Sequence, residues 1–223
     1  MTHTKSYDKA FLTGCDKTTE WMLLWFLKNF RKHNKKIPII IGDFGLSYAM
    51  KYKLENEMGY HTIDMMAQWG HLKGWFKKPQ VMIDCPAKET VWLDTDCEIL
   101  GNIEGIFNLL VPGKLNMVQD LPWSARTQET WHNSGVVGFK GKPEILRAWA
   151  HKVQMYQTDG DQEVLHSMFN DDIHRLQYIN SLPNIFNWLR IQLIDNQDNV
   201  HKKVMHWTGY KGKLKIQEIM RNG

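Results

Sequence analysis

The chain has 223 residues, a formal net charge of +4, 43% hydrophobic residues and 23% charged residues. This length allows one substantial core, and the composition is that of an ordinary folded protein rather than a disordered one. The positive charge is weak and dispersed, which argues against a nucleic-acid-binding function. The densest basic segment, Arg31–Lys36, is expected at the end of a helix, where cations favour the helix dipole.

The cysteines and the apolar runs indicate in which cellular compartment the protein is expected. Cys15, Cys85 and Cys97 are far apart and form no Cys-x-x-Cys pair, and an odd count without a framework suggests reduced thiols. The most apolar stretch, Trp21–Leu27, is too short to cross a bilayer. We therefore expect no transmembrane segment and a cytoplasmic location.

Apolar runs alternate with helical periods through the first half of the chain. Strands are expected at Ala10–Thr13, Ile37–Ile41, Tyr60–Asp64 and Thr90–Leu93, with helices at about 18–33, 46–58 and 78–85 between them. This alternation predicts an α/β fold, with a Rossmann-like, mostly parallel sheet and helices on both of its faces.

The second half continues with further strands and helices. Strands are expected at Leu115–Gln119 and Gly135–Lys140, with a polar loop, Asp120–His132, between them; helices are expected at 145–156 and at 164–169, the latter opened by Gly160-Asp161. No repeat or linker interrupts the chain, so residues 1–223 are expected to form one domain.

Two carboxylates, Asp94 and Asp96, follow the apolar strand that ends at Leu93. Asp-x-Asp alone is common in surface turns. Here the flanking strand places the pair at the carboxyl edge of an α/β sheet, where ligands bind. Paired carboxylates suit a hard divalent cation that also holds a phosphate.

Several motifs occur in one order along the chain. They are Ala10-Phe-Leu-Thr13, Lys78 sixteen residues before Asp94, Asp94-Thr-Asp96, Asn102-Ile-Glu-Gly-Ile-Phe107, Asn133-Ser-Gly-Val136, Gly160-Asp-Gln162 with Leu165, Leu182-Pro183 with Phe186-Asn187, and His206-x-x-Gly209. In this order they resemble the glycosyltransferases of family 8, the group of glycogenin and its bacterial galactosyltransferase relatives. The resemblance implies a GT-A fold, with a nucleotide-binding half at about 8–110 and a sugar- and acceptor-binding half at about 111–223.

The same resemblance implies a UDP-sugar donor of the UDP-glucose or UDP-galactose class. The residues expected to hold the nucleotide are Thr13, Gly14, Cys15, Asp16, Asp94, Thr95, Gly209, Lys211 and Lys213. The family lysine would fall at Gly212, so either Lys211 or Lys213 is expected to contact the pyrophosphate instead. Metal binding is expected from Asp94, Asp96 and His206, a mixed oxygen and nitrogen set that suits Mn²⁺, with Mg²⁺ as the alternative. For His206 the other interpretation is a loop histidine near a helix.

The transferred sugar is expected beside Lys78, Asn133, Ser134 and Gly135, and Gly135 would permit close backbone approach. Asp161 and Gln162 are the candidate catalytic residues, because a carboxylate near the anomeric carbon could act as nucleophile or stabilise an oxocarbenium-like centre. Retention of configuration follows from the resemblance. Two other interpretations stay open: Asp161 as a helix N-cap and Lys78 as a solvated surface lysine.

The acceptor is a glycan, a protein or a lipid-linked molecule that the sequence does not name. Side chains that could stack on or pair with it are Trp123, Arg126, Trp131, Trp188 and Trp207, although core packing is the commoner role for each tryptophan. The alternative functions are a catalytically silent nucleotide-sugar-binding module and a sugar-nucleotide pyrophosphorylase. The segment Gly14–Thr19 does not supply the glycine-rich, basic loop of the latter.

Overall fold

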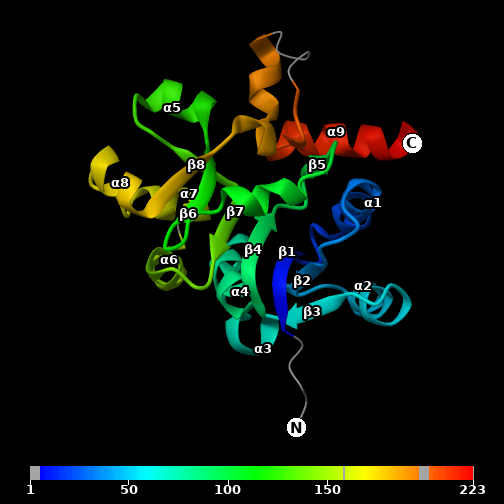
Figure 1. Ribbon diagram of the computed structural model, residues 1–223. Helices are drawn as coiled ribbons and strands as arrows, with labels where there is room; N and C mark the ends of the chain where they lie inside the picture. Colours follow the sequence, from blue (N-terminus) through cyan, green and yellow to red (C-terminus); the bar gives the residue numbers. More distant parts are fainter. Residues whose placement is uncertain (1–5, 158, 196–200, 223) are drawn as a thin grey trace.

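The computed structural model describes residues 6–157, 159–195 and 201–222. Within them, a seven-stranded sheet has the order β3-β2-β1-β4-β7-β6-β8 (Figure 1). Its strands are β1 (Tyr7–Cys15), β2 (Ile39–Asp43), β3 (His61–Asp64), β4 (Ala87–Leu93), β6 (Leu115–Gln119), β7 (His132–Lys140) and β8 (Ile179–Leu182). Strand β7 runs antiparallel to β4 and β6, and the other pairs are parallel. The expected α/β fold with a mostly parallel sheet is confirmed.

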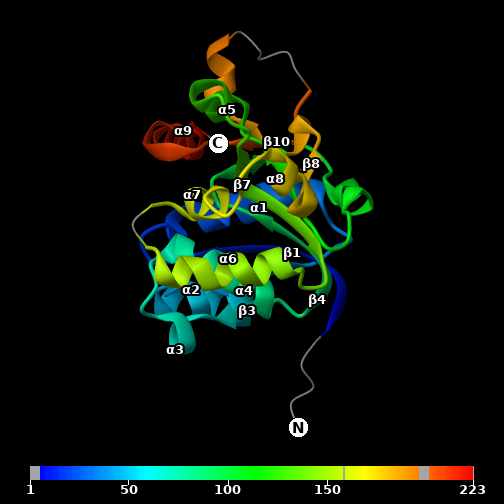
Figure 2. The same cartoon turned by 90° about the vertical axis from the view of Figure 1, so that its left-hand side faces the viewer.

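Helices cover both faces of this sheet. They are α1 (Leu23–His33), α2 (Tyr48–Tyr52), α3 (Met66–Trp69), α4 (Lys78–Asp84), α5 (Leu121–Thr127), α6 (Glu144–Met155), α7 (Asp161–His166), α8 (Asp172–Tyr178) and α9 (Gly209–Asn222). Short helical turns span Glu20–Met22, Lys53–Glu57, Gly74–Lys77, Glu104–Leu109, Asn184–Phe186 and Arg190–Asp195. Figures 1 and 2 show α1 and α2 on one face and α3, α4 and α6 on the other.

Two apolar layers separate the sheet from these helices. Successive strand side chains point to opposite faces, so Phe11 packs into the layer under α1 while Ala10 and Leu12 pack into the layer under α4 and α6. Side chains of β4 alternate between the two layers in the same way, with Trp92 in the α4 layer and its neighbour Val91 in the α1 layer. A strand buried on both sides explains the continuous apolar runs in the sequence.

The order of the strands creates a crevice between β1 and β4. The chain moves from β1 outward to β2 and β3, and then returns to place β4 on the other side of β1. In open α/β sheets, ligands bind at such a switch point, outside the carboxyl ends of the strands. Gly14 and Cys15 end β1 at this edge, and Asp94 follows β4 there.

A small second sheet brings the end of the chain to the same edge. It has the order β5-β10-β9, made of β5 (Cys97–Ile99), β10 (Val204–His206) and β9 (Trp188–Leu189). The antiparallel register of β10 and β5 sets His206 opposite Cys97. This pairing fixes where a histidine more than a hundred residues downstream meets the Asp94–Asp96 turn.

Some sequence expectations on the elements were wrong in detail. The expected loop Asp120–His132 contains helix α5, which Asp120 caps by accepting a hydrogen bond from the Trp123 N–H, and His132 already belongs to β7. Strand β1 continues through Gly14 to Cys15, and β2 runs from Ile39 to Asp43 rather than stopping at Ile41. The expected helix at 46–58 is present from Tyr48 to Glu57, and it changes from α-helical hydrogen bonding in α2 to π-helical hydrogen bonding at Lys53–Glu57.

Across the described ranges, no helix is both long and apolar enough to span a membrane.

Candidate functional site

A hollow of about 190 Å³ lies where β1 and β4 end; we call it the β1–β4 hollow. Its lining residues are Gly14, Cys15, Asp16, Thr18, Thr19, Met22, Phe44, Gly74, Trp75, Lys78, Trp92, Asp94, Thr95, Asp96, Asp161 and Lys213. The structure therefore brings together most of the residues that the sequence assigned to the nucleotide. Asp16 shapes the turn after β1, because its Oδ1 accepts hydrogen bonds from the N–H groups of Thr18 and Thr19.

A second hollow of about 350 Å³, the β7–α7 hollow, adjoins the first. It is lined by Asp94, Asp96, Asp120, Trp123, Arg126, Asn133, Ser134, Gly135, Asp161, Gln162, Glu163, Leu189, Ile191, His206 and Thr208. The two hollows share Asp94, Asp96 and Asp161. These three carboxylates thus stand at the junction of two spaces that could hold two parts of one ligand, or two ligands that meet.

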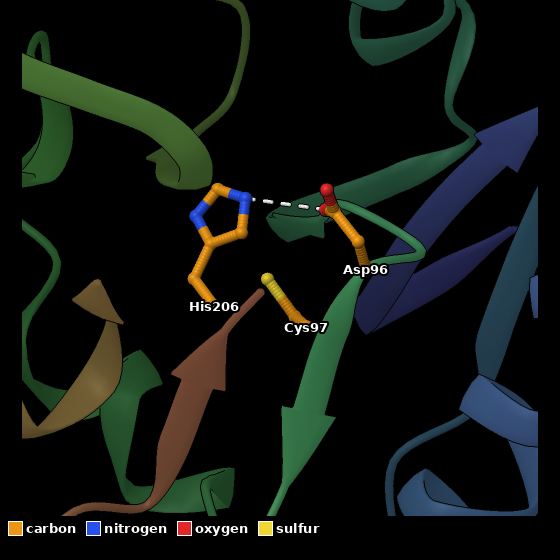
Figure 3. A group of neighbouring side chains, drawn as sticks. All are labelled: Asp96, Cys97 and His206. Carbon is orange, nitrogen blue, oxygen red and sulfur yellow. Dashed lines mark ion pairs between the residues drawn. The ribbon is translucent and has the colours of Figure 1, made fainter. Parts of the chain in front are cut away.

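Asp96, Cys97 and His206 form a compact group of potential metal ligands, with donor atoms that all lie within 4.8 Å of one another (Figure 3). His206 Nε2 lies 3.1 Å from Asp96 Oδ1. Burial would lower the pKa of His206, but the Asp96 charge outweighs it and raises that pKa; burial would raise the pKa of Asp96, but His206 lowers it. Carboxylate, imidazole and nearby thiol donors fit a first-row transition metal better than Ca²⁺.

Asp94 lies outside that group. Its Oδ1 accepts a 2.6 Å hydrogen bond from Trp92 Nε1–H and lies 3.3 Å from Lys78 Nζ. Burial raises the pKa of Asp94, and the Lys78 charge opposes the rise. The expected set of Asp94, Asp96 and His206 is therefore split in this structure, with Asp96 facing the histidine and Asp94 facing the lysine.

Lys78 lies between Asp94 and Asp161 and forms a buried cluster of charged side chains with them. Its side chain is 3% exposed, and its Nζ lies 2.8 Å from Asp161 Oδ2 and 3.0 Å from Ser134 Oγ. Burial alone would lower its pKa, but the charges of Asp161 and Asp94 raise it. The interpretation of Lys78 as a solvated surface lysine is wrong. The N-cap interpretation of Asp161 is wrong too, because Gly160 occupies the cap position and the Asp161 carboxylate pairs with Lys78.

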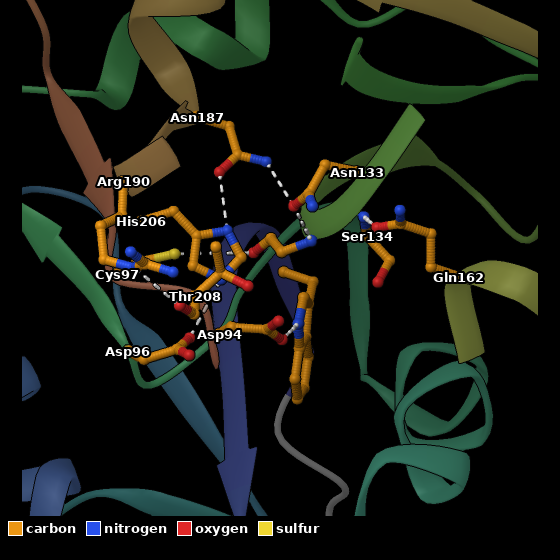
Figure 4. Close-up of polar contacts among 12 residues, drawn as sticks. Asp94, Asp96, Cys97, Asn133, Ser134, Gln162, Asn187, Arg190, His206 and Thr208 are labelled. Atoms are coloured by element: carbon orange, nitrogen blue, oxygen red, sulfur yellow. Dashed lines mark hydrogen bonds and ion pairs between the residues drawn. The ribbon is translucent and has the colours of Figure 1, made fainter. Parts of the chain in front are cut away.

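A chain of hydrogen bonds orients His206 (Figure 4). The Gly135 N–H donates to Asn133 Oδ1, so the Asn187 Nδ2 that bonds the same oxygen must also donate. Asn187 Oδ1 then faces His206 Nδ1 at 3.0 Å, which makes that nitrogen the donor. A neutral His206 oriented in this way presents the lone pair of Nε2 toward Asp96, as a metal-binding imidazole requires.

The same chain continues toward Gln162. Asp120 Oδ2 accepts from Asn133 Nδ2 at 3.1 Å and from Gln162 Nε2 at 3.2 Å. Gln162 Oε1 in turn accepts from the Ser134 N–H. The side chains around the β7–α7 hollow are therefore held in one arrangement, which is the condition for a precise polar binding site.

The position of the His206 ring requires a glycine at position 135, whether or not a ligand is bound. A Cβ at this position would lie 2.2 Å from His206 Cε1 and 2.5 Å from Nδ1. Gly135 also accepts, through its carbonyl oxygen, the hydrogen bond from the Asp94 N–H. A side chain at 135 would thus disturb both His206, which pairs with Asp96, and the backbone hydrogen bond that holds Asp94.

Three expected nucleotide-binding residues do not line either hollow. Thr13 is fully buried, Gly209 begins α9 with a positive φ of 74°, and Lys211 is exposed. Lys213 does line the β1–β4 hollow, and its charge helps to lower the pKa of Asp96. Gly212 packs against the Trp207 carbonyl so closely that a Cβ would lie 1.8 Å from its oxygen. A lysine cannot occupy position 212 in this conformation.

Among the aromatic candidates, Trp123 alone lines a described hollow, together with Arg126. Trp131 stacks on His166, Trp188 is buried, and Trp207 donates to Glu98. The sequence assigned no role in the site to Asp120, Asn187 or Trp92, although Asn187 belongs to one of the motifs that carry the family resemblance. For Asp120 a signal was present, since Asp120-Leu121-Pro122 is a helix start with proline in the first turn.

No family model matches the chain, and no curated protein matches it in sequence. Among solved structures, the galactosyltransferase LgtC in complex with donor and acceptor sugar analogs aligns with a TM-score of 0.71 at 13% identity, over 96% of this chain and 95% of that one. Mouse xyloside xylosyltransferase 1 aligns with a TM-score of 0.60 at 13% identity, over 91% and 98%. The chain has a GT-A glycosyltransferase fold. The apo form of GlyE from Streptococcus pneumoniae aligns as well, with a TM-score of 0.66 at 15% identity over 96% of this chain and 64% of that one.

Proposed function

We propose that this protein transfers a hexose from a UDP-sugar to an acceptor, with a divalent cation, Mn²⁺ in the first place, and with retention of configuration. The observation that carries the proposal is the junction of the two hollows at Asp94, Asp96 and Asp161, with His206 Nε2 turned toward it. The GT-A fold supports the same activity.

The β1–β4 hollow is the proposed nucleotide site. Its residues come mainly from the first half of the chain, which fits a nucleotide-binding half at about 8–110. The turn Gly14–Asp16 would face uracil and ribose, and Lys213 would place its charge on the pyrophosphate. We assign that contact to Lys213 rather than to Lys211, because Lys213 faces the hollow.

Asp96 and His206 would hold the metal ion, with Asp94 turning toward it when the ion pair with Lys78 loosens. A bound Mn²⁺ supplies Lewis-acid stabilisation of the charge that develops on the departing UDP. Asn187 keeps the His206 Nε2 lone pair available, and Gly135 leaves the room that the imidazole needs.

The β7–α7 hollow is the proposed site of the transferred hexose and the acceptor. Asn133, Ser134 and Gln162 offer hydrogen bonds to sugar hydroxyls, and Asp161 would place its negative charge beside the anomeric carbon as positive charge develops there. Lys78 holds that carboxylate in place at 2.8 Å. Trp123, 38% exposed, offers an apolar face to an acceptor sugar.

The test is UDP release from a panel of UDP-hexoses, with Mn²⁺ and with EDTA, by wild type, Asp96→Asn and the control Asp8→Asn. Asp8 is exposed and lines neither hollow. We expect metal-dependent release from one donor, reduced about 100-fold or more by Asp96→Asn and unchanged by Asp8→Asn. Binding of UDP and Mn²⁺ without release from any donor, even after acceptor sugars are added, would instead favour a silent nucleotide-sugar-binding module.

A further inference from the structure

A third hollow lies at the opposite edge of the sheet, where β1, β2 and β3 begin; we call it the amino-edge hollow. Its volume is about 530 Å³, within the usual range of small-molecule sites. Tyr7 lines this hollow and Gly14 lines the β1–β4 hollow, and both lie on β1. At about 3.3 Å of rise per strand residue they are about 23 Å apart. The amino-edge hollow is therefore separate from the proposed transfer site.

Cations dominate the polar lining of this hollow. Arg31, Lys35 and Lys36 line it, and its described lining residues include no aspartate or glutamate. Within the described residues, none of these three side chains forms an ion pair with a carboxylate. Glu104 accepts a hydrogen bond from the Lys36 backbone N–H, outside the lining of the hollow.

The helix dipole does not account for this concentration of charge. Helix α1 ends at His33, so Arg31 lies in its last turn, where a cation is favourable. Lys35 and Lys36 come after the end of the helix, at the rim of the hollow. The dipole effect falls off within the last turn. The carbonyl end of α1 also disfavours an anion, so affinity for one must come from the three side chains.

Two buried aromatic side chains, Phe30 at 1% and Tyr60 at 8% exposure, lie beneath these cations. Phe30 and Tyr60 line the hollow, and the Arg31 guanidinium carbon lies 4.4 Å from the centre of the Tyr60 ring. This contact holds the guanidinium in place before any ligand arrives, which lowers the entropy that binding must overcome. A guanidinium and two ammonium groups that line one hollow match the oxygens of a phosphate.

We propose that the amino-edge hollow binds the phosphate group of a phosphate-bearing ligand, such as a mononucleotide or a sugar phosphate. The phosphate lies against Arg31, Lys35 and Lys36. The phosphate belongs either to a free metabolite or to a phosphate-containing polymer, and the two sources share this chemistry.

The experiment is calorimetric titration of the full chain with AMP, inorganic phosphate and linear polyphosphate, in EDTA and without added UDP, and the variants separate binding at the amino-edge hollow from binding at the β1–β4 hollow. The variants are Arg31→Gln and the pair Lys35→Gln/Lys36→Gln. The matched control is Lys28→Gln/Lys32→Gln, which removes the same charge from exposed positions of α1 that line none of the three hollows. We expect AMP to bind the wild type and the control within twofold of each other, and each hollow variant at least about tenfold more weakly.

The remaining outcomes decide the proposal and the source of the phosphate. AMP binding tighter than that of inorganic phosphate and of polyphosphate supports the proposal with a small phosphate ester as the source. Polyphosphate binding tighter than that of AMP, with the same loss in Lys35→Gln/Lys36→Gln, supports the proposal with a polymer as the source. Binding of neither AMP nor polyphosphate to the wild type, or equal weakening by the hollow pair and the control pair, overturns it.

Discussion

Replacement of Gly135 by alanine tests how tightly the metal-binding histidine is held. The added Cβ would lie 2.2 Å from His206 Cε1, and ordinary contacts begin at 3.4 Å, so the imidazole or the β7 backbone must move by about 1 Å. His206 cannot move freely, because β10 is paired on both sides and Nδ1 is bonded to Asn187.

The size of the effect follows from that displacement. Overpacking of this kind costs about 1–3 kcal/mol of unfolding free energy. A displacement of about 1 Å at a catalytic group costs about 100-fold in rate. We therefore expect Gly135→Ala to fold, to lose about 2 kcal/mol of unfolding free energy, and to need a higher Mn²⁺ concentration for half-maximal UDP release.

The assay is urea unfolding together with a Mn²⁺ titration of UDP release. Gly105→Ala is the matched control, because a Cβ at Gly105 would meet no described atom within 4 Å. If Gly135→Ala keeps the stability and the Mn²⁺ dependence of wild type, the close approach to His206 does not position the metal ligand, and the reasoning is refuted.

Three further predictions concern charge. Lys78→Met leaves Asp94 and Asp161 buried without a cation, so urea unfolding at pH 7 should show a loss of about 3 kcal/mol. Burial raises the pKa of Asp94, so this loss should shrink at pH 5 as Asp94 takes up a proton, and an equal loss at both pH values would contradict this. Lys213→Ala should weaken UDP binding about tenfold, measured by calorimetry, while Lys211→Ala leaves it within twofold. A larger loss in Lys211→Ala than in Lys213→Ala would assign the pyrophosphate contact to Lys211. Burial lowers the pKa of His132 from 6.5 to about 4, so the folded state resists its protonation and the stability it contributes is lost as pH falls from 6.5 toward 4. Between pH 7.5 and 5 this amounts to about 2 kcal/mol, which His132→Gln should remove from the pH dependence of unfolding; an unchanged pH profile would count against the shift.

The sequence predicted best where one segment carries its own signal. The apolar run that ends at Leu93 and continues into Asp94 and Asp96 predicted both a buried strand and a polar site at its carboxyl end, and the structure has both. Strands with two buried faces are continuous apolar runs, so the parallel half of the sheet could be predicted from the sequence in the same way.

The contacts between distant segments could not be predicted locally. The pairing of β10 with β5 places Cys97 beside His206, and nothing near either residue encodes that register. Asn187 orients His206 only because β9 and β10 are neighbours. Gly135 was expected to make room for a sugar, whereas the atom closest to its missing Cβ belongs to His206. Asp120 is a different case, because its helix-start signal was present and the polar composition of the segment obscured it.

The central claim is that Asp96 and His206 hold a divalent cation against the diphosphate of UDP. The most direct measurement is calorimetric titration of the protein with UDP, in Mn²⁺ and in EDTA, for wild type and His206→Gln. The account predicts that Mn²⁺ tightens UDP binding to the wild type at least about tenfold and that His206→Gln loses this gain. UDP affinity that is the same with Mn²⁺ and with EDTA, or the absence of UDP binding, would contradict it.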